Sequence, residues 1–348
     1  MPIHTVLGLI EPDELGPTSM HEHCLVDATV WVSPPREPMP ADERVRIENL
    51  GFVHWNFDSL ADNLRLDDTE LAAHEVGRLA GVQGAAIVDL TPGWGLGPRR
   101  TAELPEISRR AGVHIIAGCG LYVHDAHPEW AESASVEQLT EMLIGELRDG
   151  VDDTGVRPGI IGEIGTSDPP TPREMRVLSA AGRAGAATGC AVNIHVDPFG
   201  RHALAVIDAL LAEGMSVERI VISHLDSYLA LDHDYHRAIA ATGAVLEFDN
   251  FGLEHYTTQP GRGLLRNRTD LERIEALAGL LDDGLAGQIV LGVDVYTKAQ
   301  LRRYGGSGYK HILTHIAPAL TEYFGATQEQ IDQMLVHTPR RVLDRPVL

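Results

Sequence analysis

Cysteine is scarce in this sequence, and long hydrophobic runs are missing. The 348 residues include only three cysteines, Cys24, Cys119 and Cys190, and none of them forms a Cys-x-x-Cys pair. An odd number of widely spaced cysteines argues against a disulfide framework and favours the reducing cytoplasm. No apolar run approaches the ~18 residues of a membrane span. No basic segment followed by an apolar stretch opens the chain, so we expect neither a membrane anchor nor a signal peptide.

Basic residues are the scarcer kind of charge. The chain has 28 Lys and Arg against 50 Asp and Glu, which gives a formal net charge of −22. Such a surface repels phosphate backbones and anionic headgroups, so neither nucleic acid nor a membrane is an expected partner. Apolar residues make up 44% of the chain and charged residues 22%, which excludes a disordered protein. We expect a globular protein whose partner is a small-molecule substrate.

Signatures of several other enzyme classes are also missing. The glycine-rich run at 93–97 has the wrong spacing for a dinucleotide fingerprint and is followed by Pro98. No Gly-x-Ser-x-Gly motif supplies a serine nucleophile. The run at 305–308 lacks the lysine of a phosphate-binding loop. Dinucleotide binding and serine hydrolysis are therefore not expected.

Short apolar runs rich in Val, Ile and Ala alternate with amphipathic segments. This alternation indicates a parallel sheet whose outer face is covered by helices. The runs lie near residues 18–26, 84–91, 113–121, 159–165, 191–196, 219–224, 244–248 and 288–294. Helices are expected over 135–149, 172–188, 201–214, 231–242, 268–284 and 306–322. The pattern predicts an α/β fold, a (β/α)8 TIM barrel that forms one domain over residues 1–348, with its active site at the C-terminal ends of the strands.

Two segments are too long for simple connections. Residues 27–83 hold several prolines and a charged helical stretch, and we interpret them as an inserted segment near the mouth of the barrel. Residues 249–267 follow the seventh predicted strand. Loops of this length are often functional, so the second segment is a candidate active-site loop.

Polar residues stand near the ends of five predicted strands. His21 and His23 are alternate residues of the first strand, so their side chains face the same way. The other four lie near the ends of the fourth, fifth, sixth and eighth runs: Glu163, His195, His224 and Asp294. The strand ends of a parallel barrel meet at one rim, so these four histidines and two carboxylates should converge.

Each of these residues alone has a simpler explanation. A lone buried histidine is more often a hydrogen-bonded core residue than a ligand. A barrel has no structural need for ionisable groups at five strand ends, however, and burying them unpaired is costly. We therefore predict a site for two divalent metal ions. Imidazole and carboxylate donors suit zinc, which we expect first, and also manganese, iron or cobalt, while the missing thiolate argues against a structural Cys-type zinc site.

Further motifs carry a family resemblance. They are Gly16-Pro17-Thr18 before the His-x-His pair and the segments 118–122, 162–166, 294–298 and 304–309. With them the chain resembles the phosphotriesterase-related family of the amidohydrolase superfamily nearly end to end. The resemblance implies a distorted barrel with two metals and a homodimer. It also implies that His21, His23 and Asp294 hold the more buried metal, and that His195 and His224 hold the more exposed one.

The residue that would bridge the metals departs from the best-known members of that family. They have a carboxylated lysine where this chain has Glu163, and a related subgroup shares the glutamate. A glutamate also supplies two oxygens, so bridging is retained, but transfer of the organophosphate activity is weakened. Many members also have a histidine just before the last aspartate, where this chain has Val293, so a proton relay through that position is missing.

The predicted chemistry is hydrolysis. Two metals lower the pKa of a shared water and polarise the scissile oxygen, and the hydroxide attacks a carbonyl or phosphoryl centre. Asp294 is the predicted catalytic residue, accepting the hydroxide proton and passing it to the leaving group, with a role as a metal ligand alone as the alternative. The leading substrate is a lactone, carboxylic ester or amide. A phosphotriester is the first alternative, and a non-catalytic small-molecule-binding barrel is the alternative from another class.

Residues for substrate recognition are predicted from position alone. Tyr122 follows the third strand and is placed to hydrogen-bond a carbonyl oxygen or the leaving group, with packing as the other reading. Lys298 and Arg302 follow Asp294 at i, i+4 spacing, and Arg262 lies in the long loop after the seventh strand. These cations would hold an anionic substrate tail, with a solvated surface as the alternative. Asp226, two residues after His224, is expected to orient a ligand from behind.

Overall fold

Parallel strands form the centre of the computed structural model, which describes residues 1–91, 93–259 and 261–348. The strands lie in two hydrogen-bonded arcs, with the orders β3-β6-β7 and β14-β11-β10-β9-β8. Their bounds are β3 (Thr18–Glu22), β6 (Ala86–Asp89), β7 (His114–Ala117), β8 (Ile161–Thr166), β9 (Val192–Val196), β10 (Ile220–Ile222), β11 (Val245–Phe248) and β14 (Ile289–Leu291). Each falls within one of the predicted apolar runs or overlaps it.

Backbone hydrogen bonds close the two arcs into a barrel. At one seam the Asp294 amide donates to the His21 carbonyl oxygen over 3.0 Å. At the other the Gly162 amide donates to the Cys119 carbonyl oxygen over 2.6 Å. The predicted (β/α)8 barrel is confirmed.

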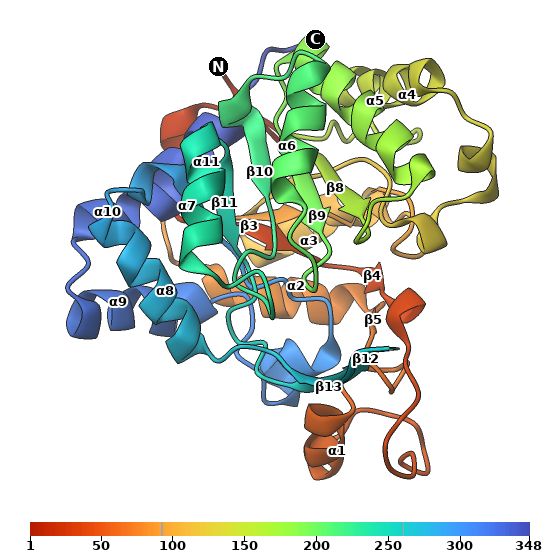
Figure 1. The fold of residues 1–348 in the computed structure, drawn as a ribbon, viewed down its shortest axis with the longest axis vertical. Coiled ribbons are helices and arrows are strands. Elements are labelled where there is room, and N and C mark those ends of the chain that lie inside the picture. The colour runs from red at the N-terminus through yellow and green to blue at the C-terminus, as the bar shows by residue number, and fades with distance from the viewer. Residues whose placement is uncertain (92, 260) are drawn as a thin grey trace.

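Helices cover the outer face of the barrel (Figure 1). They are α2 (Thr69–Val76), α3 (Leu104–Ala111), α4 (Val136–Asp149), α5 (Pro172–Thr188), α6 (Ala203–Ala212), α7 (His233–Thr242), α8 (Asp270–Asp282), α9 (Ala317–Phe324), α10 (Gln328–Asp332) and α11 (Thr338–Leu343). Local sequence sets several of their starts. Thr171 and Glu174 form a capping box at α5, as Thr269 and Glu272 do at α8.

One predicted helix begins later than expected. The helix expected over 306–322 starts with a π-helical turn at Ile312–Ile316 and continues as α9. Gly306 explains the delay, because a Cβ at that position would lie 2.2 Å from the carbonyl oxygen of Gln300. The chain makes a tight turn there, which lets the Tyr309 hydroxyl donate to the His23 carbonyl oxygen over 2.8 Å.

One hydrophobic layer fills the interior of the barrel, and a second lies between the strands and the surrounding helices. Met20, Val88 and Ile116 from one arc form an inner cluster with Val221, Val245 and Val290 from the other arc. Their strand neighbours pack outward against the helices in a second, larger cluster. Because successive side chains of a strand alternate in direction, apolar residues at every position serve both layers.

The two long segments lie at the opposite end of the barrel from the chain termini (Figure 1). The first contains α1 (Leu50–Trp55) and a short ladder of β4 (Val26–Asp27) with β5 (Arg65–Leu66). It is shorter than the predicted 27–83, since α2 is the barrel's own first helix and packs beside α3. The second carries the hairpin of β12 (Tyr256–Gln259) and β13 (Gly263–Arg266), and β12 contacts α1. A small hairpin of β1 (Ile3–Thr5) and β2 (Gly8–Ile10) lies near the termini.

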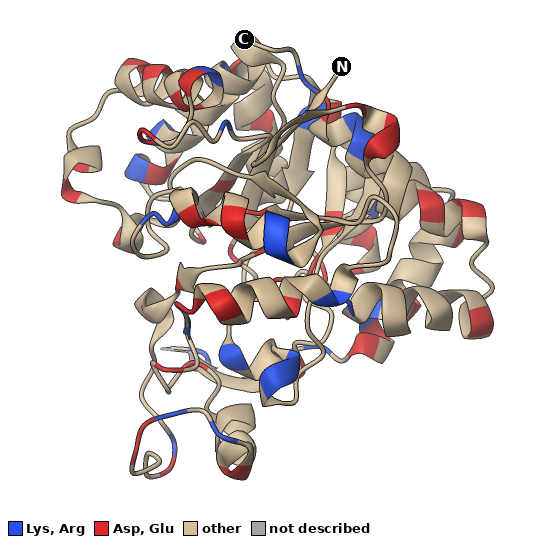
Figure 2. Ribbon diagram, turned by 180° about the vertical axis from the view of Figure 1, so that it is seen from behind, with Lys and Arg blue, Asp and Glu red and all other residues tan. Residues whose placement is uncertain are grey.

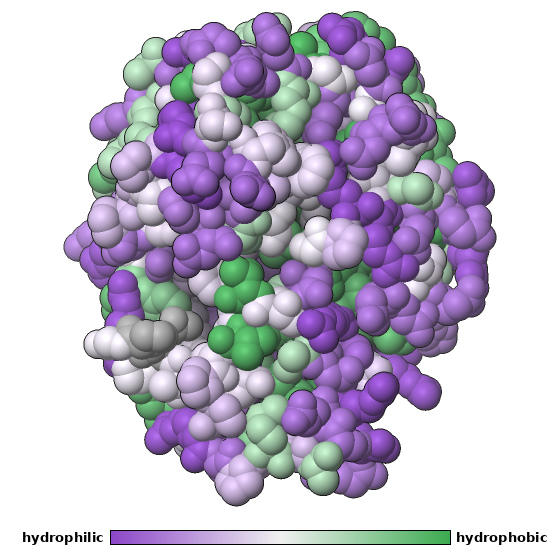
Figure 3. All heavy atoms as spheres, turned by 90° about the vertical axis from the view of Figure 1, so that its right-hand side faces the viewer, coloured by the Kyte–Doolittle hydropathy of each residue, from purple (hydrophilic) through white to green (hydrophobic). Residues whose placement is uncertain are grey.

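The surface is acidic and mostly hydrophilic. Figure 2 shows Asp and Glu spread over the outer helices rather than gathered in one patch. On the side seen in Figure 3, small hydrophobic areas interrupt a largely hydrophilic face. Among the helices that the structure describes, none has the length and apolar character needed to cross a bilayer.

Candidate metal centre

The predicted ligand residues converge at one rim of the barrel. His21, Glu163 and His195 lie on β3, β8 and β9, while His224 and Asp294 follow β10 and β14. All of these side chains are buried, and so is that of His23. His224 and Asp294 have φ values of 60° and 49°, a left-handed conformation that is costly for residues other than glycine. Such strain, observed at two strand ends that meet, is typical of functional positions.

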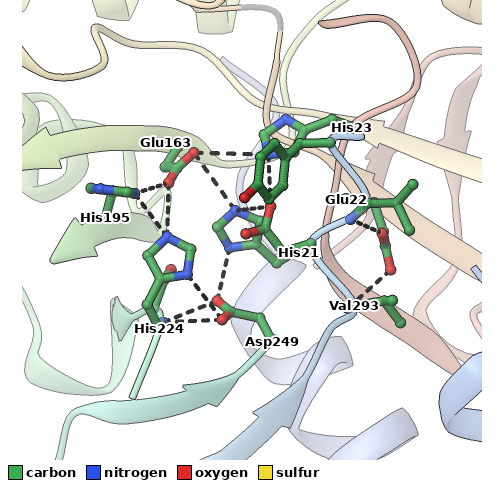
Figure 4. A network of polar contacts seen from close by, with 12 residues as sticks. His21, Glu22, His23, Glu163, His195, His224, Asp249 and Val293 are labelled. Carbon is green, nitrogen blue, oxygen red and sulfur yellow. Dashed lines mark hydrogen bonds and ion pairs between the residues drawn. The ribbon is translucent and has the colours of Figure 1, made fainter. Parts of the chain in front are cut away.

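Glu163 lies between two groups of ligand atoms (Figure 4). Its Oε1 faces the first strand, 3.6 Å from His21 Nε2 and 4.0 Å from His23 Nε2. Its Oε2 faces the other side, 2.6 Å from His195 Nδ1 and 3.2 Å from His224 Nε2. Asp294 Oδ1 completes the first group, 3.2 Å from His23 Nε2 and 3.8 Å from His21 Nε2. One carboxylate therefore presents one oxygen to each of two half-sites.

The donor atoms fit divalent metal ions. His21 Nε2 is buried and has no hydrogen-bond partner among the described residues, although it points into the cluster. Four overlapping sets each have ligand atoms within 4.8 Å of one another: His21, His23 and Glu163; His21, His224 and Asp294; Glu163, His195 and His224; and His21, Glu247 and Asp249. Nitrogen and carboxylate donors at such spacing suit zinc and related cations. The residues present thus match the predicted cofactor.

Opposite charges stabilise each other in the cluster. Burial would raise the pKa of Glu163, but the imidazoles of His195 and His21 hold it well below its usual value. Burial would lower the pKa of His21, but the carboxylates of Glu163 and Asp249 raise it well above the usual value. The pKa of His224 is raised in the same way, by Asp249 and Glu163 against the effect of burial. Glu163 therefore remains an ionised carboxylate, the form that binds a cation.

A second layer of carboxylates orients the histidines. The Asp249 carboxylate, just after β11, lies 3.1 Å from His21 Nδ1 and 3.0 Å from His224 Nδ1. Glu247 on the same strand lies 3.3 Å from His21 Nδ1 and accepts from Asn193 Nδ2 over 2.6 Å. Hydrogen bonding at one imidazole nitrogen fixes the ring and leaves the other nitrogen for a metal. Asp249 thus positions one histidine from each half-site.

Asp226 does not orient His224 directly, contrary to the prediction. Its carboxylate accepts from the backbone amides of Asp249 and Asn250 over 3.2 and 3.0 Å, and it pairs with the buried Arg273 at 3.3 Å. The physical reason is the left-handed turn at His224, which directs the following residues behind the end of β11. Asp226 therefore supports the segment that carries Asp249.

The His23 side of the centre has its own supports. His23 Nδ1 lies 3.0 Å from Thr91 Oγ1. The Glu22 carboxyl group accepts from the amides of Val293 and Val295 over 3.2 and 3.0 Å, one residue to either side of Asp294 (Figure 4). Burial raises the pKa of Glu22 to about 8. Glu22 therefore ties β3 to the segment that presents Asp294.

Tyr122 lies beside the second half-site. Its hydroxyl is 3.4 Å from His195 Nδ1 and accepts a hydrogen bond from Trp31 Nε1 over 3.2 Å. Trp31 comes from the inserted segment and also stacks over the His195 ring, with centroids 6.3 Å apart. Burial and the nearby carboxylates raise the pKa of Tyr122 well above its usual value, so the hydroxyl keeps its proton. Tyr122 is therefore a hydrogen-bond donor at the cavity wall.

A cavity of about 140 Å³ opens from the cluster. His23, Glu163, His195, His224 and Asp294 form its inner end. The remaining wall is partly aromatic and partly polar, and consists of Val26, Ala28, Trp31, Asp58, Leu96, Tyr122, Asp197, Pro198, Phe199, Ser227, Tyr228, Asn250, His255, Thr257, Asn267 and Tyr296. Among the described residues that line it there is no lysine and no arginine.

The three predicted substrate-binding cations do not line this cavity. Lys298 Nζ forms an ion pair with Asp62 at 2.7 Å, and Arg302 points toward the Gly306 carbonyl oxygen. The i, i+4 prediction fails because two separate 3-10 turns, Lys298–Gln300 and Arg302–Tyr304, replace a continuous helix. Arg262 donates to the Phe199 carbonyl oxygen over 2.7 Å and lies over the Phe199 ring, outside the wall that this ring forms.

Several functional residues were missed by sequence reasoning. Glu247 and Asp249 alternate along a buried strand as His21 and His23 do, which is a signal that was present and not used. Asp58 and Trp31 lie in an irregular segment, where no periodicity reports which way a side chain points. Asp197 follows His195 by two residues and carried the same alternation signal.

Comparison with known proteins agrees with the fold and shows the family. A model of the phosphotriesterase family matches residues 1–343. The chain is 36% identical over 346 residues to a human N-acetyltaurine hydrolase, with 98% of this chain and 97% of the relative covered. It is similar to the crystal structure of a resiniferatoxin-binding protein from Rhodobacter sphaeroides, with 35% identity, a TM-score of 0.92, and 99% and 95% of the two chains covered. It is also similar to a lactonase from Listeria monocytogenes, with 25% identity, a TM-score of 0.80, and 99% and 100% covered.

Proposed function

The chain belongs to the phosphotriesterase family and is a metal-dependent hydrolase, and we propose that it cleaves a carboxylic amide, with lactones as the second substrate class. The observation that carries the proposal is the placement of Glu163, with one carboxylate oxygen toward each of two half-sites at the inner end of a cavity. The amide is placed first because the relatives that match at 36% identity are N-acetyltaurine hydrolases. The lactone comes second because of the Listeria lactonase.

We propose that six residues hold two divalent ions. His21, His23 and Asp294 would hold one ion, His195 and His224 the other, and Glu163 would contact both. When bound, the ions supply an activated water as nucleophile and polarise the scissile carbonyl group. Zinc is the first choice of metal, with manganese, iron or cobalt as alternatives.

Asp294 would accept and donate the proton in this reaction. Its carboxylate lies at the inner end of the cavity, 3.2 Å from His23 Nε2, and Gln300 Nε2 donates to its backbone carbonyl oxygen over 2.7 Å. An amine is a poor leaving group until its nitrogen is protonated. Hydrolysis of an amide therefore needs a group that accepts a proton from water and then donates it to the leaving nitrogen. The position of the Asp294 carboxylate at the inner end of the cavity supports both roles.

Tyr122 and Trp31 would orient the acyl part of the substrate. The protonated Tyr122 hydroxyl faces the cavity beside His195, and the Trp31 indole N–H donates to it. Trp31, Leu96 and Val26 give this side of the wall an apolar surface that limits access of bulk water. A positioned hydroxyl beside an apolar wall suits a small acyl group.

The experiment that tests the function is a turnover assay on metal-loaded protein. Short N-acyl amides, a lactone panel and an aryl phosphotriester would be assayed side by side, with Glu163→Ala as the inactive control. We expect hydrolysis of amides or lactones that is lost in the variant. Turnover of the phosphotriester alone would make the substrate class wrong, and ligand binding without any turnover would favour a non-catalytic binding barrel.

Four finer features belong to the same proposal. Zinc would be identified by elemental analysis of protein purified without added metal. A homodimer would be tested by light scattering coupled to size-exclusion chromatography. The three cysteines are free and buried, which supports a reducing compartment such as the cytoplasm, and fractionation of the native cells would test it. The net charge of −22 supports the absence of a nucleic-acid partner.

A further inference from the structure

The wall of the cavity beyond the metal centre carries an unneutralised carboxyl group. Asp58, from the inserted segment, lines the cavity and has an exposed fraction of only 7%. The Thr257 hydroxyl donates to its Oδ2. Among the described residues no Lys, Arg or His forms an ion pair with Asp58. A buried carboxylate in this state is costly unless something else in the cavity satisfies it.

The neighbouring polar side chains are neutral. Tyr228 and Thr257 line the same part of the cavity, and the Tyr228 hydroxyl lies 3.4 Å from His255 Nε2. Burial and the charge of Arg273 lower the pKa of His255 to about 3, so its ring carries no charge at neutral pH. Burial raises the pKa of Asp58 to about 6, which leaves the carboxyl mainly ionised at pH 7 and above. No protein group near Asp58 therefore offsets its charge.

Three arginines close to the wall residues bind groups that do not face the cavity. Arg268 Nε donates to the Tyr228 carbonyl oxygen over 2.9 Å, and Arg262 donates to the Phe199 carbonyl oxygen over 2.7 Å. Arg273 is buried against Asp226 and Asp270. A second carboxylate, Asp197, lines the cavity, where one of its oxygens accepts from the Phe199 amide over 2.7 Å. Among the described lining residues outside the ligand cluster, the fixed charges are thus all negative.

We propose that Asp58 and Thr257 form a recognition site for the substrate's remote end, and that this end is an amine or another hydrogen-bond donor rather than an acid group. The inference rests on the proposed function and names the substrate class for the same cavity. An ammonium group would supply the missing cation and donate to the Asp58 carboxylate. A carboxylate or sulfonate at the same place would meet the like charge of Asp58, and no lysine or arginine of the described wall would offset it.

The proposed substrate class differs from the substrate in the name of the N-acetyltaurine hydrolases. N-acetyltaurine bears a sulfonate, and the described wall offers no lysine or arginine to receive it. A hydrolase with the same metal centre and an acidic outer wall would instead select N-acyl amines whose second terminus is basic or hydroxylic. Specificity in a shared fold changes through such wall residues while the chemistry is retained.

The test uses three amides that differ only at the remote end. Each has the form CH3CO-NH-CH2-CH2-X, where X is an ammonium, a hydroxyl or a sulfonate group. For the metal-loaded enzyme at pH 7.5 and constant ionic strength (~0.1 M, to limit long-range screening differences), we expect kcat/KM to fall in that order. The total span should be at least about a hundredfold, as expected for exchanging a favourable for an unfavourable charge contact. Preference for the sulfonate would overturn the inference while leaving the proposed function intact.

Asp58→Asn links the preference to one side chain. The amide keeps an oxygen for the Thr257 hydroxyl and removes the charge, so the ratio of kcat/KM between the ammonium and hydroxyl substrates should fall about tenfold or more, mainly through KM. Asp42→Asn makes the same charge change at an exposed position of the same segment and serves as the matched control. Asp58→Ser provides a second variant if the asparagine variant folds poorly. An unchanged ratio in a folded Asp58 variant would overturn the proposal.

Binding measurements keep the test independent of turnover. If no amide and no lactone is hydrolysed, the proposed function fails. Thermal shift measurements with the same three amides still test whether the cavity wall at Asp58 binds an ammonium group. We expect the ammonium compound to stabilise the wild-type protein more than the sulfonate compound, and this difference to disappear in Asp58→Asn. Equal or greater stabilisation by the sulfonate compound would contradict the recognition site.

Discussion

The two ends of the cavity are built by different parts of the molecule. The inner end consists of residues at the ends of barrel strands, and second carboxylates or backbone groups hold several of them in place, as Asp249 holds His21 and His224. The outer wall draws on the inserted segment and the segment with the β12–β13 hairpin, as Asp58 and Thr257 show. A barrel rim fixes side chains through its strand register, whereas long loops can change without disturbing it. The contrast suggests that the chemistry belongs to the barrel and that substrate choice belongs to the loops.

The two ends also differ in how their charges are balanced. At the inner end Glu163 is surrounded by histidines, and opposite charges hold its pKa low. At the outer wall Asp58 has a hydroxyl as its partner, and burial raises its pKa. Changes at the inner end should therefore alter metal binding and rate together. Changes at the outer wall should alter selectivity and stability while the metal stays bound.

The strongest test of this contrast is Glu163→Ala. Removing the carboxylate that faces both half-sites should lower metal content well below two equivalents and reduce kcat/KM by at least about a thousandfold. Elemental analysis and turnover on the same sample would measure both effects. Circular dichroism checks that the fold is retained. Full metal content and near-normal turnover in the variant would show that Glu163 does not join the half-sites.

Asp249→Asn should have the next largest effect. The amide weakens the hold on the His21 and His224 rings but leaves every proposed ligand in place, so metal affinity should fall about ten- to hundredfold. Competition with a chromogenic chelator measures the affinity. Asp226→Asn is less suitable as a control because it breaks the buried pair with Arg273, so Asp42→Asn serves again. Unchanged affinity in Asp249→Asn would mean that the rings are oriented without this carboxylate.

Tyr122→Phe probes the boundary between the two regions. The variant loses one hydrogen-bond donor beside His195 and keeps the ring, so kcat should fall about tenfold, the effect of one hydrogen bond of about 1.4 kcal/mol. Metal content should not change, because Tyr122 is not among the proposed ligands. Steady-state kinetics with parallel metal analysis would separate the two. Loss of metal would place Tyr122 within the metal centre instead.

The smallest expected effect is that of Asp58→Asn on stability, which is separate from the change in selectivity expected above. Burial raises the pKa of Asp58 from 3.8 to about 6, so the folded state favours the protonated carboxyl. The destabilisation therefore grows as pH rises from the unfolded to the folded pKa, and is fully present above it. The variant removes this cost, so its gain in unfolding free energy should be about 1 kcal/mol larger at pH 8 than at pH 5. Denaturant titrations at both pH values measure it. A difference in unfolding free energy that does not change with pH would mean that folding does not raise the pKa of Asp58.

Sequence reasoning was most successful where side-chain direction follows from strand geometry. The eight strands and the barrel were predicted from apolar runs, and the structure brings all six predicted ligands to one rim. His21 and His23 converge because alternate residues of one strand point the same way. The same rule would also have pointed to Glu247 and Asp249. Residues 306–309 do not form the predicted helix, because the backbone at Gly306 approaches that of Gln300 closely and makes a turn. The hydrophobic pattern of the sequence does not report such a contact.

The sequence by itself determined the barrel and the set of polar residues at its strand ends, because strand periodicity and strand ends can be recognised from the local sequence. The tertiary structure alone decided which charges face the substrate. It turned Lys298 toward Asp62, kept Arg262 behind Phe199 and brought Asp58 to the cavity wall. The direction of a side chain in a long irregular segment depends on contacts with distant parts of the chain, and no local pattern encodes those contacts.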